Sequence, residues 1–203
     1  FKHSENIYDP AELFKLVGKE DLEKNNIKWI NFIPFNDTYA MAVKREFAEK
    51  NELKTLGDLK KFIENNEKIL FGVNPEFYER ADGFFAMADE YNLNVPKNWI
   101  KTMQAGLTYE ALDKGQLDVA MVYSTDAKLL KYNLVVLKDD KNFFPHYNPA
   151  VLVRKEILDK YPEIEQILKP LTMYLTEEII IRLNYLVDIE GYEPDIVAEN
   201  YLK

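Results

Sequence analysis

The sequence predicts an α/β protein in which helices alternate with short apolar strands. Between residues 27 and 137, apolar runs of strand length are separated by segments with helical periodicity, and the turns between them are brief. From residue 155 onward only helical patterns follow. Such alternation is typical of parallel βαβ units, so we expect a parallel sheet followed by a helical block.

Turn and cap residues bound the elements of the first half of the chain. Asp9-Pro10 predicts a helix start, and Thr55 with Asp58 three positions later forms a capping-box pattern. Asn74-Pro75 indicates the end of a strand. In order, we expect a helix over 11–17 with a polar helical extension to 25, strands over 27–33 and 40–43, a helix or loop over 44–51, a helix over 56–63, a strand over 68–73 and a helix over 80–91.

Similar signals bound the second half. Gly115 stands where a residue with left-handed backbone commonly follows a helix. Thr125 and Asp126 predict the cap of a short helix that ends at Lys131. In order, we expect a helix over 107–114, a strand over 118–123, the short helix, strands over 134–137 and 150–153, and helices over 155–161, 163–171, 176–189 and 194–202.

Composition excludes several classes of function. The formal net charge of -9 would repel a phosphate backbone, so nucleic acid is not an expected partner. The 203 residues include no cysteine and only His3 and His146 as histidines, which leaves almost no material for thiolate catalysis, a metal site or a serine triad. The adjacent acidic pairs at 139–140 and 177–178 are interpreted as solvated surface. No run approaches the ~18 apolar residues of a membrane span.

Aromatic and polar residues remain as material for a site. Tyr39, Tyr123 and Tyr147 each stand beside turn-forming polar residues near a predicted strand end, where an open α/β sheet presents side chains to a ligand. A trimethylammonium group has no proton to donate, so proteins bind it with the negative faces of aromatic rings. If such a ligand bears a carboxylate, one arginine can fix that end.

Six motifs in the same order resemble the substrate-binding proteins of glycine betaine/carnitine/choline ABC transporters. The resemblance runs from about Tyr8 to Leu202. The motifs are Pro-Phe-Asn-Asp-Thr-Tyr-Ala-Met-Ala-Val at 34–43, Arg-Ala-Asp-Gly at 80–83, Gly-Leu-Thr-Tyr-Glu-Ala-Leu at 106–112, Tyr-Ser-Thr-Asp at 123–126, Asp-Asp-Lys-Asn-Phe-Phe-Pro at 139–145 and Leu-Asn-Tyr-Leu-Val-Asp at 183–188.

This resemblance implies a two-lobed fold of the type II periplasmic-binding-protein class. Residues 1–39 and 143–203 would belong to lobe one, and residues 40–142 would form lobe two. Relatives begin with a further βαβ segment of lobe one, so we expect part of that lobe to be missing at the N-terminus of this chain. Ligands of such proteins lie between the lobes.

The resemblance also implies roles for individual residues. Tyr39, Tyr123 and Tyr147 would form the walls of an aromatic cage, and Asp37 would line its ammonium end. Arg80 would bind a carboxylate, which favours a carboxylate-bearing ligand.

Two of these residues have structural interpretations that the sequence leaves open. Arg80 could instead be a surface arginine at a helix start, paired with Asp82 or Glu79. Asp37 could be a turn residue whose side chain accepts a hydrogen bond from nearby backbone.

The function implied is solute binding without chemistry or cofactor. The protein would capture a quaternary ammonium compound outside the cytoplasm, either in the periplasm or at the outer membrane face, and deliver it to an ABC transporter permease; it could be lipid-anchored or fused to that permease. Glycine betaine, carnitine, proline betaine and choline all remain open. The alternatives are the effector-binding sensor domain of a transcriptional regulator, which would require a DNA-binding segment, and, least favoured, an enzyme on the same fold.

Overall fold

The structure, a computed structural model, describes residues 9–65 and 68–203. The first residues of the predicted lobe-one segment, 1–8 with His3 and Tyr8, lie outside the described residues. The strands are β1 (Ile27–Phe32), β2 (Tyr39–Lys44), β3 (Phe71–Val73), β4 (Ile100–Thr102), β5 (Val119–Tyr123), β6 (Leu134–Val136) and β7 (Ala150–Arg154). The helices are α1 (Pro10–Asn25), α2 (Arg45–Lys50), α3 (Leu56–Glu64), α4 (Pro75–Glu79), α5 (Phe84–Glu90), α6 (Ala105–Asp113), α7 (Lys128–Lys131), α8 (Lys155–Lys160), α9 (Glu163–Met173), α10 (Glu177–Asp188) and α11 (Pro194–Tyr201).

Five strands form one mixed sheet in the order β4-β3-β5-β2-β6. Strand β3 runs parallel to both β4 and β5, whereas β2 runs antiparallel to β5 and β6. The prediction of an α/β fold is therefore confirmed, but the expectation of a parallel sheet was wrong for β2, which alone among these five strands runs against the others. The reason is topological: β2 enters the sheet at the edge where β5 ends, so the two strands must run in opposite directions.

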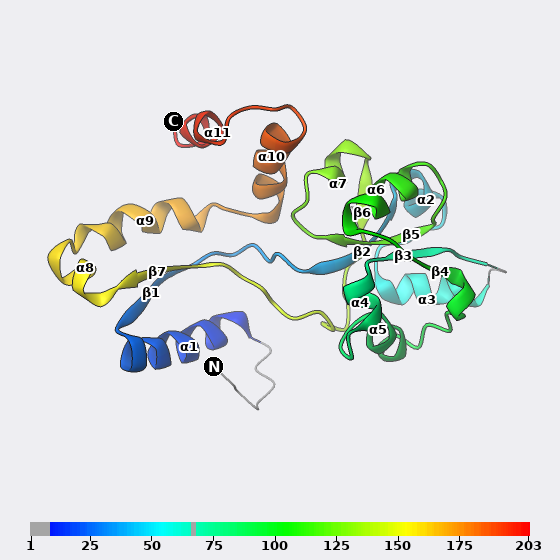
Figure 1. Cartoon of the computed structure of the whole chain (residues 1–203), viewed down its shortest axis with the longest axis horizontal. Helices are drawn as coiled ribbons and strands as arrows, with labels where there is room; N and C mark the ends of the chain where they lie inside the picture. Colours follow the sequence, from blue (N-terminus) through cyan, green and yellow to red (C-terminus); the bar gives the residue numbers. More distant parts are fainter. Residues whose placement is uncertain (1–8, 66–67) are drawn as a thin grey trace.

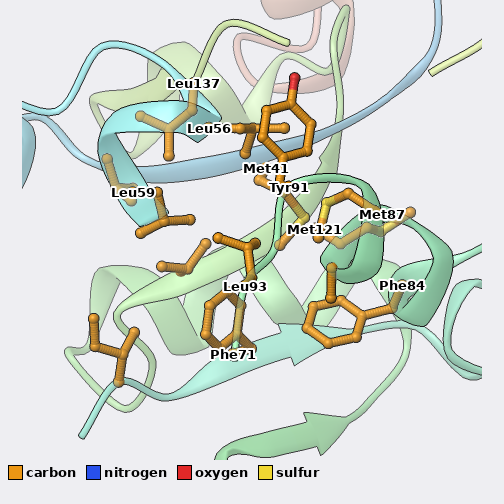
Figure 2. Packing of buried hydrophobic residues seen from close by; sticks show 14 of the residues in the cluster. Met41, Leu56, Leu59, Phe71, Phe84, Met87, Tyr91, Leu93, Met121 and Leu137 are labelled. Atoms are coloured by element: carbon orange, nitrogen blue, oxygen red, sulfur yellow. The ribbon is translucent and has the colours of Figure 1, made fainter. Parts of the chain in front are cut away.

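Alternating side chains of β2 build a core on each face of this sheet. Met41 and Val43 lie on the face covered by α3 and α5, and both are fully buried. Ala40 and Ala42 face the opposite layer, where α6 and α7 pack. Figure 2 shows the first of these cores, in which side chains from α3 and α5 close over the sheet. This alternation is the period expected of a strand buried on both faces.

A two-stranded antiparallel ribbon of β1 and β7 forms the other end of the molecule, with α1, α8 and α9 around it (Figure 1). Phe14 of α1 packs edge-on against Trp29 and Phe32 of β1, with ring centroids 5.6 and 5.7 Å apart. The buried carboxylate of Asp21 accepts hydrogen bonds of 2.7 Å from the indole N–H of Trp29 and the amide of Asn25. These contacts fix α1 on the ribbon.

Three short elements differ from the sequence prediction. Helix α4 was not expected, because Asn74-Pro75 was interpreted as the end of a strand; Asn74 in fact caps α4 by accepting a 2.7 Å bond from the Phe77 N–H, and Pro75 begins the helix. Strand β4 was also missed. The helix expected over 80–91 begins only at Phe84.

In the described ranges, no helix combines the length and apolar character needed to cross a membrane.

Candidate functional site

Two tyrosines meet at one edge of the sheet. Tyr39 begins β2 and Tyr123 ends β5, and the two residues are register partners in the antiparallel ladder. Directly opposed residues project side chains to the same face of a sheet. The two ring centroids accordingly lie 5.4 Å apart, with 33° between the ring planes. Burial, followed by the neighbouring Tyr123, raises the pKa of Tyr39 above its ordinary value, so the phenol stays neutral at physiological pH.

The segment that follows β3 brings an aromatic ring and a cation to this pair. Phe77 of α4 is buried, and its ring centroid lies 5.2 Å from that of Tyr39. Arg80 is the C-cap of α4, and its guanidinium carbon lies 5.8 Å from the centroid of the Tyr39 ring. The carboxyl ends of β3 and β5 thus meet at one edge, which is where ligands of open α/β sheets commonly bind.

Arg80 is held by acidic neighbours. Its Nε and Nη2 atoms donate to the two carboxylate oxygens of Asp82, both at 2.8 Å, and Nη1 makes a longer 3.4 Å contact with Glu76. The hydrogen bonds to Asp82 raise the pKa of Arg80, and the same bonds lower the pKa of Asp82. Of the two partners considered from the sequence, Asp82 is correct, and Glu76 takes the place proposed for Glu79.

Tyr147 reaches the site from the segment that leads back toward β7. Its backbone N–H donates to the side-chain oxygen of Asn36 at 2.6 Å, and its carbonyl accepts from the Asp37 N–H at 3.4 Å. Its side chain is 47% exposed, and its interaction with Arg80 contributes to the raised pKa of that arginine. Tyr147 therefore interacts with the guanidinium of Arg80 while about half of its surface stays exposed.

Asp37 lies beside the loop that follows β5. Its carboxylate accepts a 2.7 Å hydrogen bond from the hydroxyl of Thr125. The neighbouring Ser124 accepts from the Thr38 N–H at 2.9 Å and donates to the Asn36 carbonyl at 2.8 Å. The turn before β2 and the loop after β5 are thus joined by side-chain hydrogen bonds, which keeps Asp37 close to Tyr123.

A buried tyrosine of α6 holds the backbone of Tyr123 in place. The hydroxyl of Tyr109 is fully buried in α6 and accepts a 2.8 Å hydrogen bond from the Tyr123 N–H. Burial raises the pKa of Tyr109 well above its ordinary value. Tyr109 therefore fixes the end of β5, although it presents no surface to a ligand.

A pocket of about 190 Å³ adjoins Tyr39. Polar groups from the turn before β2 and from the loop after β6 line it together with apolar strand residues. The lining residues are Asn36, Thr38, Tyr39, Ala40, Ser124, Val136, Leu137, Lys138, Asp139, Asn142, Phe144 and His146.

Within residues 9–65 and 68–203, no three histidine, aspartate or glutamate side chains cluster as metal ligands would.

The structure brings the predicted site residues into one region. Tyr39, Tyr123, Tyr147 and Arg80 are linked by ring and guanidinium contacts, and Asp37 joins them through the Thr125 hydroxyl and the backbone of Tyr147. Phe77 was missed, because nothing in its sequence position distinguishes a ring beneath a site from any other buried ring. Whether these residues contact a ligand stays a prediction.

The interpretation of Asp139 as solvated surface was wrong. Its carboxylate accepts hydrogen bonds from the hydroxyl of buried Tyr91 and, at 2.8 Å, from the Phe144 N–H. It therefore shapes the loop that lines the pocket. Glu177, in the other acidic pair, is exposed but accepts a 3.0 Å bond from the Asn36 N–H, so α10 is tied to the turn before β2.

Comparisons with known proteins agree on one family. The family model described as the substrate binding domain of ABC-type glycine betaine transport systems matches residues 7–203. A glycine-betaine-binding protein of Pseudomonas aeruginosa is 35% identical over 209 residues, which cover 100% of this chain and 67% of that protein. The carnitine transport binding protein OpuCC of Listeria monocytogenes is 38% identical over 200 residues, which cover 98% of this chain and 63% of that protein.

A solved structure is also similar along nearly the whole chain. The crystal structure of a glycine betaine/carnitine/choline ABC transporter protein aligns with a TM-score of 0.88 and 35% identity, covering 97% of this chain and 70% of that one. The chain spans about two thirds of the length of the two curated relatives.

Proposed function

Because the chain belongs to the family of substrate-binding domains of ABC-type glycine betaine transport systems, we propose that it binds a quaternary ammonium compound and delivers it to a membrane permease. The predicted fold, an α/β fold of the type II periplasmic-binding-protein class, is confirmed by the structural likeness. One of the two relatives is a glycine-betaine-binding protein and the other is a carnitine transport binding protein. The alternative of a regulator's sensor domain has no support from them.

The observation that carries this proposal is the Tyr39–Tyr123 pair at the sheet edge. Two phenol rings lie 5.4 Å apart there, and the guanidinium of Arg80 already lies over one of them. A ring that accepts this cation has the electrostatic character needed for an ammonium ligand. In the proposed complex, Tyr147 is the third wall and Asp37 supplies negative charge at the ammonium end.

The free energy that three aromatic rings contribute can be compared with the free energy of micromolar binding. Each ring contributes about 0.5–2 kcal/mol to binding of a desolvated cation, so three rings supply at most about 6 kcal/mol. Micromolar affinity corresponds to about 8 kcal/mol. The remainder must come from Asp37, from contacts to the rest of the ligand and from exclusion of water, so we propose that the site closes when it is occupied.

We propose a closure between two lobes, with residues 1–39 and 143–203 in one and residues 40–142 in the other. In this proposal the two segments that connect the lobes are bonded to each other on the lobe-one side: the Ile33 N–H donates to the Pro149 carbonyl at 3.0 Å, and the Asn148 amide donates to the Phe35 carbonyl at 2.8 Å. Tyr147 lies on one crossing segment and remains half exposed. Closure would bury it against the ligand and strengthen its interaction with the cation.

The proposed role places the protein outside the cytoplasm and involves no turnover. Its partners would be the small molecule and the permease, since these are what the substrate-binding component of an ABC importer must contact. Attachment by a lipid anchor or by fusion to the permease is left open.

Calorimetric titration with choline, glycine betaine and carnitine tests the proposal. At least one compound should bind with a one-to-one stoichiometry and raise the midpoint of thermal unfolding, because a ligand specific for the folded state at a hundredfold excess over Kd stabilises it by about 2.7 kcal/mol. Tyr161, which is 43% exposed on a segment after α8, provides the control variant Tyr161→Ala. Absence of heat and of any thermal shift with all three compounds would overturn the proposal.

A further inference from the structure

The guanidinium beside the proposed cage is already engaged by a carboxylate. Nε and Nη2 of Arg80 both donate to Asp82 at 2.8 Å, which is the fork-to-fork geometry that a ligand carboxylate would itself require. The remaining nitrogen, Nη1, makes the 3.4 Å contact with Glu76. The side-on Nε–Nη2 edge of Arg80 is therefore not free for an incoming ligand, which leaves the end-on Nη1–Nη2 edge, where Nη1 already contacts Glu76.

A ligand carboxylate would have to compete with Asp82 for that edge. Asp82 is two residues from Arg80, and a group on so short a tether acts at an effective concentration in the millimolar range. Asp82 is the accessible partner, with a side-chain exposure of 64% against 35% for Arg80, so the aspartate can move away from the guanidinium without loss of buried packing. The competition thus weakens carboxylate binding without blocking the site.

The charged side chains around the proposed cage also disfavour a ligand that bears a carboxylate. Arg80 contributes one positive charge, whereas Asp82 and Glu76 contribute two negative charges within ion-pair distance of it. Asp37 adds a further negative charge near Tyr123. The net charge of these four side chains is negative, which favours a ligand with net positive charge over a zwitterion of similar size.

We propose that Asp82 is a specificity-determining residue that biases the site toward quaternary ammonium ligands without a carboxylate, such as choline, and against zwitterions such as glycine betaine. This inference rests on the proposed function and specifies the ligand class of the same site. Of the two interpretations of Arg80 that the sequence leaves open, this inference follows pairing with Asp82 rather than binding of a ligand carboxylate.

The test is calorimetric titration of the unmodified protein and of Asp82→Asn with choline and with glycine betaine. Asp82→Asn leaves one neutral amide oxygen as acceptor in place of the carboxylate, so the glycine betaine carboxylate competes better for the Nε–Nη2 edge of Arg80, and the lost negative charge opposes choline. The ratio of the choline Kd to the glycine betaine Kd should therefore rise by about three- to fivefold, the range expected for an exposed ion pair. The control is Glu79→Gln, which removes an exposed charge from α4 outside the Arg80–Asp82–Glu76 contacts and should leave the ratio unchanged.

The outcomes separate this inference from the proposed function. If the unmodified protein binds either compound but Asp82→Asn leaves the ratio as it was, or Glu79→Gln shifts it equally, Asp82 does not determine specificity and the proposed function stands. If neither compound binds to the unmodified protein or to Asp82→Asn, the inference fails; the proposed function fails as well only if carnitine also does not bind. Far-ultraviolet circular dichroism of each variant confirms that both fold before titration.

Discussion

Tyr39 and Tyr123 are register partners in an antiparallel ladder, and their ring centroids lie 5.4 Å apart at the edge where β2 begins and β5 ends. Their neighbourhood follows from strand direction, because an antiparallel pairing places the first residue of one strand opposite the last residue of the other. A parallel β2 would have carried Tyr39 to the far edge of the sheet. The reversal of β2 is therefore what creates the pair.

Replacement of Tyr123 by alanine is expected to weaken binding of a quaternary ammonium compound. The variant loses one ring face and the ring contact between Tyr123 and Tyr39, so the affinity should fall by about 1 kcal/mol or more. Titration calorimetry with the best ligand of the unmodified protein measures the change, and Tyr161→Ala serves as the control. An unchanged Kd for Tyr123→Ala would exclude this tyrosine from the cage.

Replacement of Phe77 by alanine is expected to destabilise the fold. Phe77 is 1% exposed and its ring contacts Tyr39, Phe84 and Phe144, so truncation leaves a cavity beneath the site and should lower the free energy of unfolding by about 3–5 kcal/mol. Urea denaturation measures this loss. Ile167→Ala, at a side chain that is 66% exposed, should change the free energy by no more than about 0.5 kcal/mol. Similar effects from the two variants would contradict the packing described for Phe77.

The contribution of Asp21 to stability is expected to depend on pH. Hydrogen bonds from Asn25 and Trp29 lower the pKa of Asp21 in the folded protein. A lowered pKa means that the carboxylate stabilises the fold above the unfolded-state pKa of about 3.9, and that this contribution disappears as the pH falls through the folded-state value. Asp21→Asn should therefore be less stable than the unmodified protein near neutral pH.

The measurement is the difference in free energy of unfolding between the unmodified protein and Asp21→Asn from about pH 7 to about pH 3. The difference should shrink as the pH falls, because protonation removes the carboxylate that the variant already lacks. A difference that stays constant, or grows in acid, would show that ionised Asp21 does not hold α1 on the ribbon.

Two glycines should respond in opposite ways to alanine. A Cβ at Gly83 would lie 2.0 Å from the backbone carbonyl oxygen of Phe77, so Gly83→Ala must displace the turn that carries Arg80 and should cost about 1–3 kcal/mol or more. A Cβ at Gly106, in the first turn of α6, meets nothing within 4 Å. Gly106→Ala should therefore raise stability by about 0.4–1 kcal/mol. Thermal unfolding measures both, and destabilisation by Gly106→Ala would count against the geometry of α6.

Features encoded by neighbouring residues could be predicted from the sequence. Both hydrogen bonds of the predicted capping box of α3 are present. The Thr55 hydroxyl accepts from the Asp58 N–H at 3.0 Å, and the Asp58 carboxylate accepts from the Thr55 N–H at 3.1 Å. Helix α4 carried an equally local signal, because Asn before Pro is typical of a helix start as well as of a strand end. Helix α4 was missed because the same Asn-Pro pair is compatible with either interpretation, and the strand end was chosen.

Features that depend on distant partners could not be predicted. The direction of β2 is set by its neighbours in the sheet and leaves no trace in its own residues. Asp139 accepts a hydrogen bond from the hydroxyl of Tyr91, which is 48 positions away in the sequence. Because no neighbouring residue indicates this partner, Asp139 was interpreted as a solvated surface charge. For the site, motifs identified Tyr39, Tyr123 and Tyr147, which the structure places in one region, whereas the bidentate engagement of Arg80 required coordinates.

The most direct test of the central claim compares choline with its neutral carbon isostere, in which a tert-butyl group replaces the trimethylammonium group. The two molecules have nearly the same shape, so only the attraction between a positive charge and the faces of Tyr39, Tyr123 and Tyr147 distinguishes them. Titration calorimetry should show binding of choline and no more than weak binding of the isostere. Equal affinities would show that the site selects shape alone, and the proposal of a tyrosine cage for a cation would be wrong.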